Sequence, residues 1–106
     1  MTLQEVEVRL LMSLKRSMLG CIPNSLRAIK YRIEGENITV ICIADGPLSE
    51  EEAEAISCAQ TETLTDFIHT HVVEFETHEI PMPAPITIIG DWYFRRYEKA
   101  IKSLDD

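Results

Sequence analysis

The fold is decided by residues 26–44, which read LRAIKYRIEGENITVICIA. Residues 26–34 alternate imperfectly between apolar and polar side chains, with Ile29 and Tyr31 on one face and Ala28 and Lys30 on the other. Residues 38–44 are apolar on both faces, which predicts a central strand covered on at least one side. Gly35-Glu36-Asn37 supplies a turn between the two runs. The stretch therefore predicts a β-hairpin.

A helix is predicted before this hairpin. Thr2, followed by Glu5 three residues later, has the pattern of a capping box. Apolar residues then recur at helical spacing, and Gly20 is suited to end the helix in a left-handed conformation. The first helix is expected over about residues 3–19.

A second helix is predicted after the hairpin. Asp45-Gly46-Pro47 breaks the chain, and Ser49 with Glu52 repeats the capping-box pattern at the start of a helix over about residues 50–70. One face of this helix is expected to be buried, and it consists of Ala53, Ile56, Thr63, Leu64, Phe67 and Ile68.

The last part of the chain predicts two more strands. Residues 72–80 alternate between an apolar and a polar face, and Glu74 and Glu76 lie on the polar one. The prolines at 81, 83 and 85 cannot donate ladder hydrogen bonds, so an extended connection or a sheet edge is expected there. Residues 86–97 predict a final strand, bent at Gly90, and residues 98–106 a weak helical turn or a frayed end.

These predictions place the chain in the α+β class, as one domain over residues 1–106. The element order is α-β-β-α-β-β, with about four mostly antiparallel strands. Two hairpins joined across a helix, with both helices packed on one face of the sheet, are expected. The other face of the sheet would be partly open to solvent, where a partner could bind. The pattern does not determine the strand order.

The charge of the chain favours some partners over others. Eighteen acidic residues against ten basic ones give a net charge of −8. This charge repels nucleic acid and anionic membranes and attracts basic partners, although it could also serve solubility alone. No apolar run approaches the roughly 18 residues of a membrane span, and no secretory signal is visible. The three cysteines lack a CxxC pair, which fits a reducing compartment, so we expect a cytoplasmic protein without membrane contact.

Catalytic patterns are missing from the sequence. It contains no GxSxG, Walker or GxGxxG motif. His69-Thr70-His71 is the nearest approach to a metal site, but residues two apart do not share a helix face, and zinc needs three or four converging ligands. The run of glutamates at residues 50–54 is more typical of a solvated helix face than of a catalytic pair. We therefore expect no catalytic residue, metal or cofactor, and no enzyme activity.

The segment from Trp92 to Tyr97, WYFRRY, combines aromatic and basic residues. Such a segment could stack nucleic-acid bases, or it could form a protein-binding hot spot, where Trp, Tyr and Arg are enriched. Because the chain is acidic overall, we favour contact with protein over contact with RNA.

Four segments together resemble a known family. They are LGCIPNSLRA at residues 19–28, DGPLSEEE at 45–52, TETLTDF at 61–67 and YFRRYE at 93–98. Over about residues 10–98 the chain resembles the immunity proteins of bacterial contact-dependent growth inhibition and related polymorphic toxin systems. The resemblance implies a cytoplasmic antidote that binds the C-terminal toxin domain delivered by a neighbouring cell. Toxins of this type are often basic nucleases, and an acidic inhibitor would suit such a target.

The partner-binding surface is expected in three places, and the chain is expected to be a monomer or a weak dimer. An acidic adaptor or subunit with another basic partner is the alternative function. A small enzyme is a third hypothesis, which would need His69, His71 or His78 to converge with Cys58 and a carboxylate. The predicted partner-binding residues are Glu50, Glu51 and Glu54 in the second helix, Glu74 and Glu76 in the third strand, and Trp92, Tyr93, Arg95 and Tyr97 in the last segment.

Overall fold

The computed structural model describes residues 1–20 and 22–98. The predicted α+β class and element order are confirmed. The predicted helical turn or frayed end at residues 98–106 lies almost wholly outside the described residues. The elements are α1 (Leu3–Ser17), β1 (Leu26–Glu34), β2 (Asn37–Ala44), α2 (Glu50–Asp66), β3 (Val72–Glu79) and β4 (Asp91–Arg95).

Both helices begin at the predicted capping boxes. The Glu5 amide donates to the Thr2 hydroxyl over 3.1 Å, and the Thr2 amide donates to the Glu5 carboxylate over 2.8 Å. Ser49 and Glu52 make the same reciprocal pair at the start of α2. These bonds satisfy amide groups that the first turn of a helix leaves without partners. Both helices end earlier than predicted, at Ser17 and Asp66.

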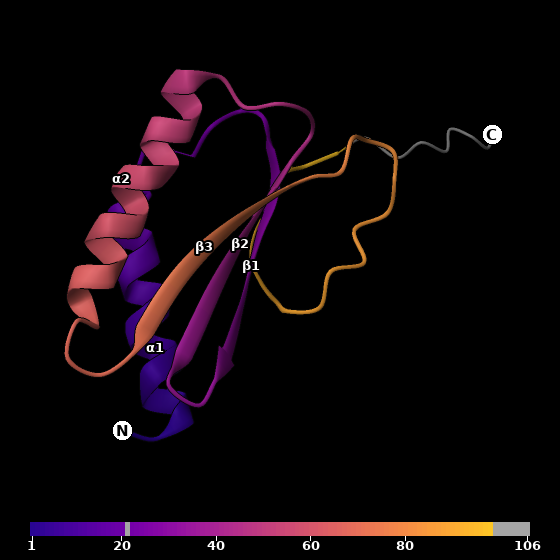
Figure 1. The fold of residues 1–106 in the computed structure, drawn as a ribbon. Coiled ribbons are helices and arrows are strands. Elements are labelled where there is room, and N and C mark those ends of the chain that lie inside the picture. Colours follow the sequence, from indigo (N-terminus) through magenta and orange to yellow (C-terminus); the bar gives the residue numbers. More distant parts are fainter. Residues whose placement is uncertain (21, 99–106) are drawn as a thin grey trace.

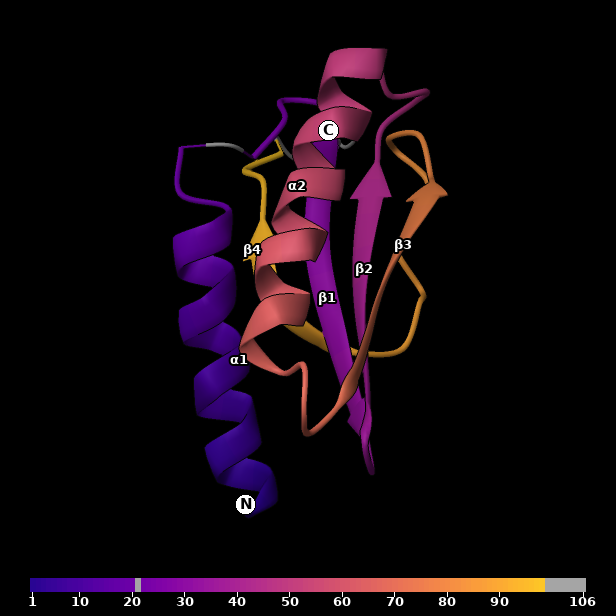
Figure 2. The ribbon, with the colours of Figure 1, turned by 60° about the vertical axis from the view of Figure 1, so that its left-hand side comes forward.

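The sheet has the strand order β3-β2-β1-β4. β1 pairs antiparallel with β2 and with β4, whereas β2 pairs parallel with β3. The first predicted hairpin is therefore confirmed, and the second is wrong, because β3 and β4 lie at opposite edges of the sheet. α2 carries the chain back along the sheet, so that β3 runs parallel to β2, and residues 80–90 then cross the sheet to reach β1. Figures 1 and 2 show both helices on one face, as predicted.

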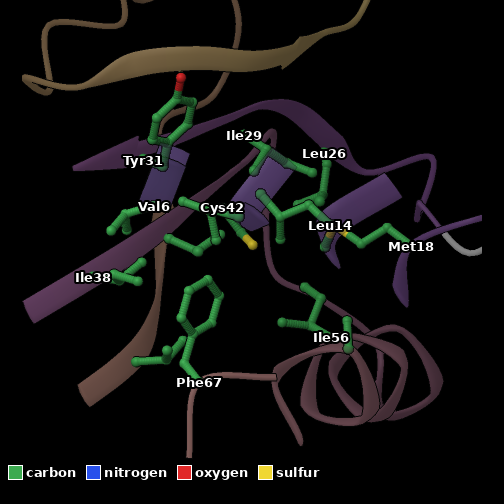
Figure 3. Packing of buried hydrophobic residues seen from close by; sticks show 14 of the residues in the cluster. Val6, Leu14, Met18, Leu26, Ile29, Tyr31, Ile38, Cys42, Ile56 and Phe67 are labelled. Carbon is green, nitrogen blue, oxygen red and sulfur yellow. The ribbon is translucent and has the colours of Figure 1, made fainter. Parts of the chain in front are cut away.

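The main core lies between the helices and the sheet (Figure 3). Leu10 and Leu14 of α1, Phe67 after α2 and Cys42 of β2 are at most 1% exposed. Burial raises the pKa of the Cys42 thiol to about 12. On α2, Ile56, Thr63 and Phe67 are buried as predicted, together with Ala59, but Ala53, Leu64 and Ile68 are exposed.

The opposite face of the sheet, which was predicted to be partly open to solvent, is covered at its centre. Ala28, Ile41 and Ile43 are fully buried there, and residues 80–90 pack over them. Figure 1 shows this segment on the side of the sheet away from the helices. The cover is required because β2 is apolar on both faces. Gly90, at φ +156°, permits close approach to β1, since an added Cβ would lie 3.0 Å from the Tyr31 carbonyl oxygen.

Candidate partner-binding surface

The start of α2 carries an outward acidic face, which we define as Glu50, Glu51 and Glu54. All three side chains are exposed, and no ion pair within residues 1–20 and 22–98 involves them. Glu50 and Glu51 lie in the first turn, where the helix dipole favours negative charge. Part of this acidity therefore stabilises the helix, and Glu54 lies beyond that effect.

The face of the sheet opposite the helices presents most of the other predicted residues. Glu76 pairs with Ile41, Ile41 with Lys30, and Lys30 with Trp92, so one cross-strand row runs from the β3 edge to the β4 edge. Side chains in such a row share a face of the sheet. Glu74 lies two residues before Glu76 and therefore on the same face. We call Glu74, Glu76, Trp92 and Arg95 the far-face group.

Trp92 is the aromatic centre of this group. Its side chain is 42% exposed. The ammonium nitrogen of Lys30 lies 4.2 Å from its ring centroid, and the guanidinium carbon of Arg95 lies 4.4 Å from it. Cations at these distances are attracted to the ring face. A pocket of about 300 Å³ adjoins the ring, and Pro83, Pro85 and Arg95 are among its lining residues.

The two predicted tyrosines differ in exposure. Tyr97 is 88% exposed, beyond the end of β4. Tyr93 is half-buried and packs against the main core, and its burial raises the pKa of its hydroxyl. Tyr93 therefore contributes to packing, and Tyr97 is free to contact a partner.

An ion-pair network that the sequence did not predict holds residues 80–90 over the face of the sheet opposite the helices. Arg27 donates to both carboxylate oxygens of Glu98 over 2.8 and 3.1 Å, and to the carbonyl oxygens of Ile80 and Ala84 over 2.7 and 2.8 Å. Arg96 joins Glu98 to Asp45, with N–O distances of 3.2 and 3.0 Å. The hydrogen bond with Glu98 raises the pKa of Arg27, and the same bond lowers the pKa of Glu98. The only local signal in the sequence is that alternation along residues 26–34 sets an arginine on the same face as Ile29 and Tyr31.

The histidines do not assemble an alternative site. His71 packs edge-on against Phe67, with ring centroids 5.4 Å apart, and His78 Nε2 lies 3.1 Å from a Glu76 carboxylate oxygen. Cys58 is exposed on α2, where its thiol lies 3.8 Å from Glu54. Across the described ranges, no three His, Cys, Asp or Glu side chains are grouped to hold a metal ion. Among these residues, too, no helix is long and apolar enough to cross a bilayer.

Comparison with known families identifies the family of this chain. Residues 7–98 match the family model of the MafI2 immunity protein, and this range includes every strand, all of α2 and most of α1. The chain belongs to the MafI2 immunity protein family. The predicted resemblance to immunity proteins of polymorphic toxin systems is thereby confirmed.

Other comparisons add little to the MafI2 assignment. A search of curated proteins finds no match. Among solved structures, "MamM CTD - Copper form" is similar to this chain at a TM-score of 0.45 and 16% identity, over 79% of this chain and 92% of that one. A similarity of that size supports no functional argument. As a MafI2 immunity protein, the chain serves immunity to a polymorphic toxin.

Proposed function

We propose that this MafI2 immunity protein acts without catalysis, by binding its cognate toxin domain one-to-one in the cytoplasm and covering a surface that the toxin needs. Family membership over residues 7–98 is the observation that supports immunity by binding. The net charge of −8 supports a basic toxin, and a nuclease is the class of toxin that most needs a basic cleft.

The acidic face of α2 is the surface we propose for this contact. Its three carboxylates project from the helix layer into solvent, and none of the ion pairs described above neutralises them. Complementary charges of this kind raise association rates from about 10⁵–10⁶ M⁻¹s⁻¹ towards 10⁸ M⁻¹s⁻¹ at low salt. They also disfavour partners of the wrong charge.

The far-face group is the competing surface, because its Trp92 and Arg95 are residue types enriched in hot spots, and the exposed Tyr97 follows β4. It lies on the side of the sheet opposite α2, so variants can test the two surfaces separately. The acidic face is preferred here because Arg95 and Lys30 give the surroundings of Trp92 a positive character, which a basic toxin would not favour.

The test compares two charge reversals of equal size. Glu50→Lys/Glu54→Lys changes the acidic face, and Glu34→Lys/Glu36→Lys changes the exposed turn between β1 and β2. Each pair of reversals adds four charges, so both variants change the net charge from −8 to −4. Loss of Glu50 from the first turn costs about 0.3–1 kcal/mol of stability, so circular dichroism first establishes that both variants are folded.

We expect the α2 variant to associate with the toxin domain at least about tenfold more slowly than the control variant at low salt. The difference should shrink as salt screens the charges. Equal rates for the two variants would exclude the acidic face. A loss of binding confined to Trp92→Ala/Arg95→Ala would transfer the interface to the far face.

A further inference from the structure

Helix α1 has two apolar sides. One side packs into the main core through Val6, Leu10 and Leu14, which are at most 4% exposed. The other side carries Val8, 50% exposed, and Met12, 67% exposed, one helical turn apart. Core packing explains the first side and leaves the second unexplained. An amphipathic surface helix normally has a single apolar stripe.

The second side continues beyond both ends of the helix. Met1 precedes the N-cap and is 60% exposed, and Leu19 follows the last turn and is 75% exposed. We call Met1, Val8, Met12 and Leu19 the outer stripe. Val8 and Met12 also border a groove of about 740 Å³, which is further lined by Thr2, Gln4, Glu5, Arg9, Ser13, Arg16 and Asp66. The groove therefore leaves space beside Val8 and Met12 for the side chains of a second molecule.

The apolar residues of the stripe are symmetric about residue 10, and so is one pair of opposite charges on the helix. Val8 and Met12 lie two positions on either side of it, Glu5 and Lys15 five positions, and Met1 and Leu19 nine positions. A two-fold axis perpendicular to the helix at this point places each member against its counterpart in a second, antiparallel copy. Val8 then meets the partner's Met12, and Glu5 meets the partner's Lys15.

We propose that this chain forms an antiparallel two-fold dimer through the outer stripe of α1. A parallel arrangement is disfavoured, because it sets Glu5 against the partner's Glu5 and Lys15 against the partner's Lys15. Closed two-fold contacts of one patch with itself are the commonest form of self-association. The contact is small, since a single pair of facing helices buries less than a large obligate interface. The dimer is therefore weak.

The distribution of charge favours α1 over α2 as the helix through which two acidic copies associate. α1 carries two acidic and three basic side chains, whereas α2 carries six acidic side chains and no basic one. Two molecules of net charge −8 repel one another across α2 and not across α1. The dimer leaves the acidic face of α2 free for the proposed toxin contact, so the two proposals can fail independently.

The first experiment measures molecular mass by sedimentation from about 5 μM to about 500 μM protein. We expect a concentration-dependent change from monomer to dimer, and at least tenfold weaker dimerisation in Met12→Glu. Leu3→Glu is the matched control, because Leu3 lies on the same helix, is also 67% exposed and is outside the stripe. A monomer throughout the range, or equal weakening by both variants, would overturn the proposal.

The second experiment tests the antiparallel orientation. In a chain with Cys21 and Cys58 changed to serine, Val8→Cys is mixed with Met12→Cys and oxidised. Cysteines whose Cα atoms lie more than about 7 Å apart cannot be bridged without moving the backbone. The antiparallel dimer therefore predicts a predominance of the mixed cross-link, and a predominance of Val8→Cys linked to itself would contradict it. So would loss of toxin binding by Met12→Glu with no change in sedimentation, because the stripe would then belong to the toxin contact.

Discussion

Arg27 reaches four acceptors at once: two oxygens of Glu98 and the carbonyl oxygens of Ile80 and Ala84. Its side chain is only 5% exposed. Through these bonds one residue of β1 holds the residues that leave β3, cross the far face and follow β4. Removing Arg27 from this partly buried network leaves one Glu98 carboxylate oxygen and two carbonyl groups without a donor among those described, which costs more than losing an exposed pair.

At the residue scale, Arg27→Met should lower the free energy of unfolding by about 3 kcal/mol. Arg32→Met is the control, since Arg32 is more exposed and donates only to the Ile89 carbonyl among the described residues, so it should cost about 1 kcal/mol or less. Urea unfolding measures both variants. Equal losses in the two variants would show that the network does not hold the far-face segment.

Alternation of side chains correctly predicts that Glu74 lies on an exposed face of β3, and it fails at Arg27. It groups Arg27 with Ile29, but the pairing of β1 with β2 shifts register between Leu26 and Ala28, and Arg27 bonds to the segment on the far face. A bulge adds one residue and changes the face of its neighbour. The acceptors of the Arg27 side chain lie 53 to 71 residues away in the chain, so no local pattern could identify them.

At the element scale, a polar clasp joins the two helices. The Ser13 hydroxyl donates to the Asp66 carboxylate over 2.6 Å, Arg16 forms an ion pair with the same carboxylate, and Ser17 and Thr63 share a hydrogen bond of 3.2 Å. The hydrogen bond from Ser13 is the largest cause of the lowered pKa of Asp66, and the bond from Arg16 lowers this pKa further. The clasp fixes how α1 lies against α2.

This lowered pKa predicts the direction of a pH effect. An aspartate whose pKa is lower in the folded state binds fewer protons there, so its stabilisation is full above its unfolded pKa of about 3.9. It is lost as the pH falls through the lower folded pKa. Asp66→Asn should therefore reduce the thermal midpoint at pH 7, and the gap from the parent chain should narrow below about pH 4. Glu62→Gln, on the exposed side of the same helix, should leave the profile unchanged, and a constant gap for Asp66→Asn would refute the explanation.

Local signals in the sequence predicted the helices and strands. The pairing of strands that are distant in the chain is known only from the structure. Both helix starts were predictable because each capping box lies within four residues, and the β1–β2 hairpin because its turn is short. The pairing of β3 with β2 depends on how α2 returns the chain, and that of β4 on how residues 80–90 cross the sheet. These connections are long, and a sequence pattern does not encode their path.

At the scale of the whole molecule, most of the predicted partner-binding residues divide between two faces. Glu50, Glu51 and Glu54 lie on the helix side, and the far-face group lies across the sheet from them. Composition predicted the acidity, and the resemblance predicted the immunity family, but neither could place these residues relative to one another. The fold thus provides separate surfaces for the proposed toxin contact on α2 and the proposed self-association through α1.

We propose that this chain neutralises its toxin by binding it. The most direct test titrates the purified chain into the C-terminal domain of its cognate toxin, while degradation of RNA and DNA by that domain is followed. We expect the nuclease activity to fall linearly and to end at one chain per toxin domain. Full toxin activity in the presence of a several-fold excess of the chain, or inactivation of many toxin molecules by each chain, would contradict it.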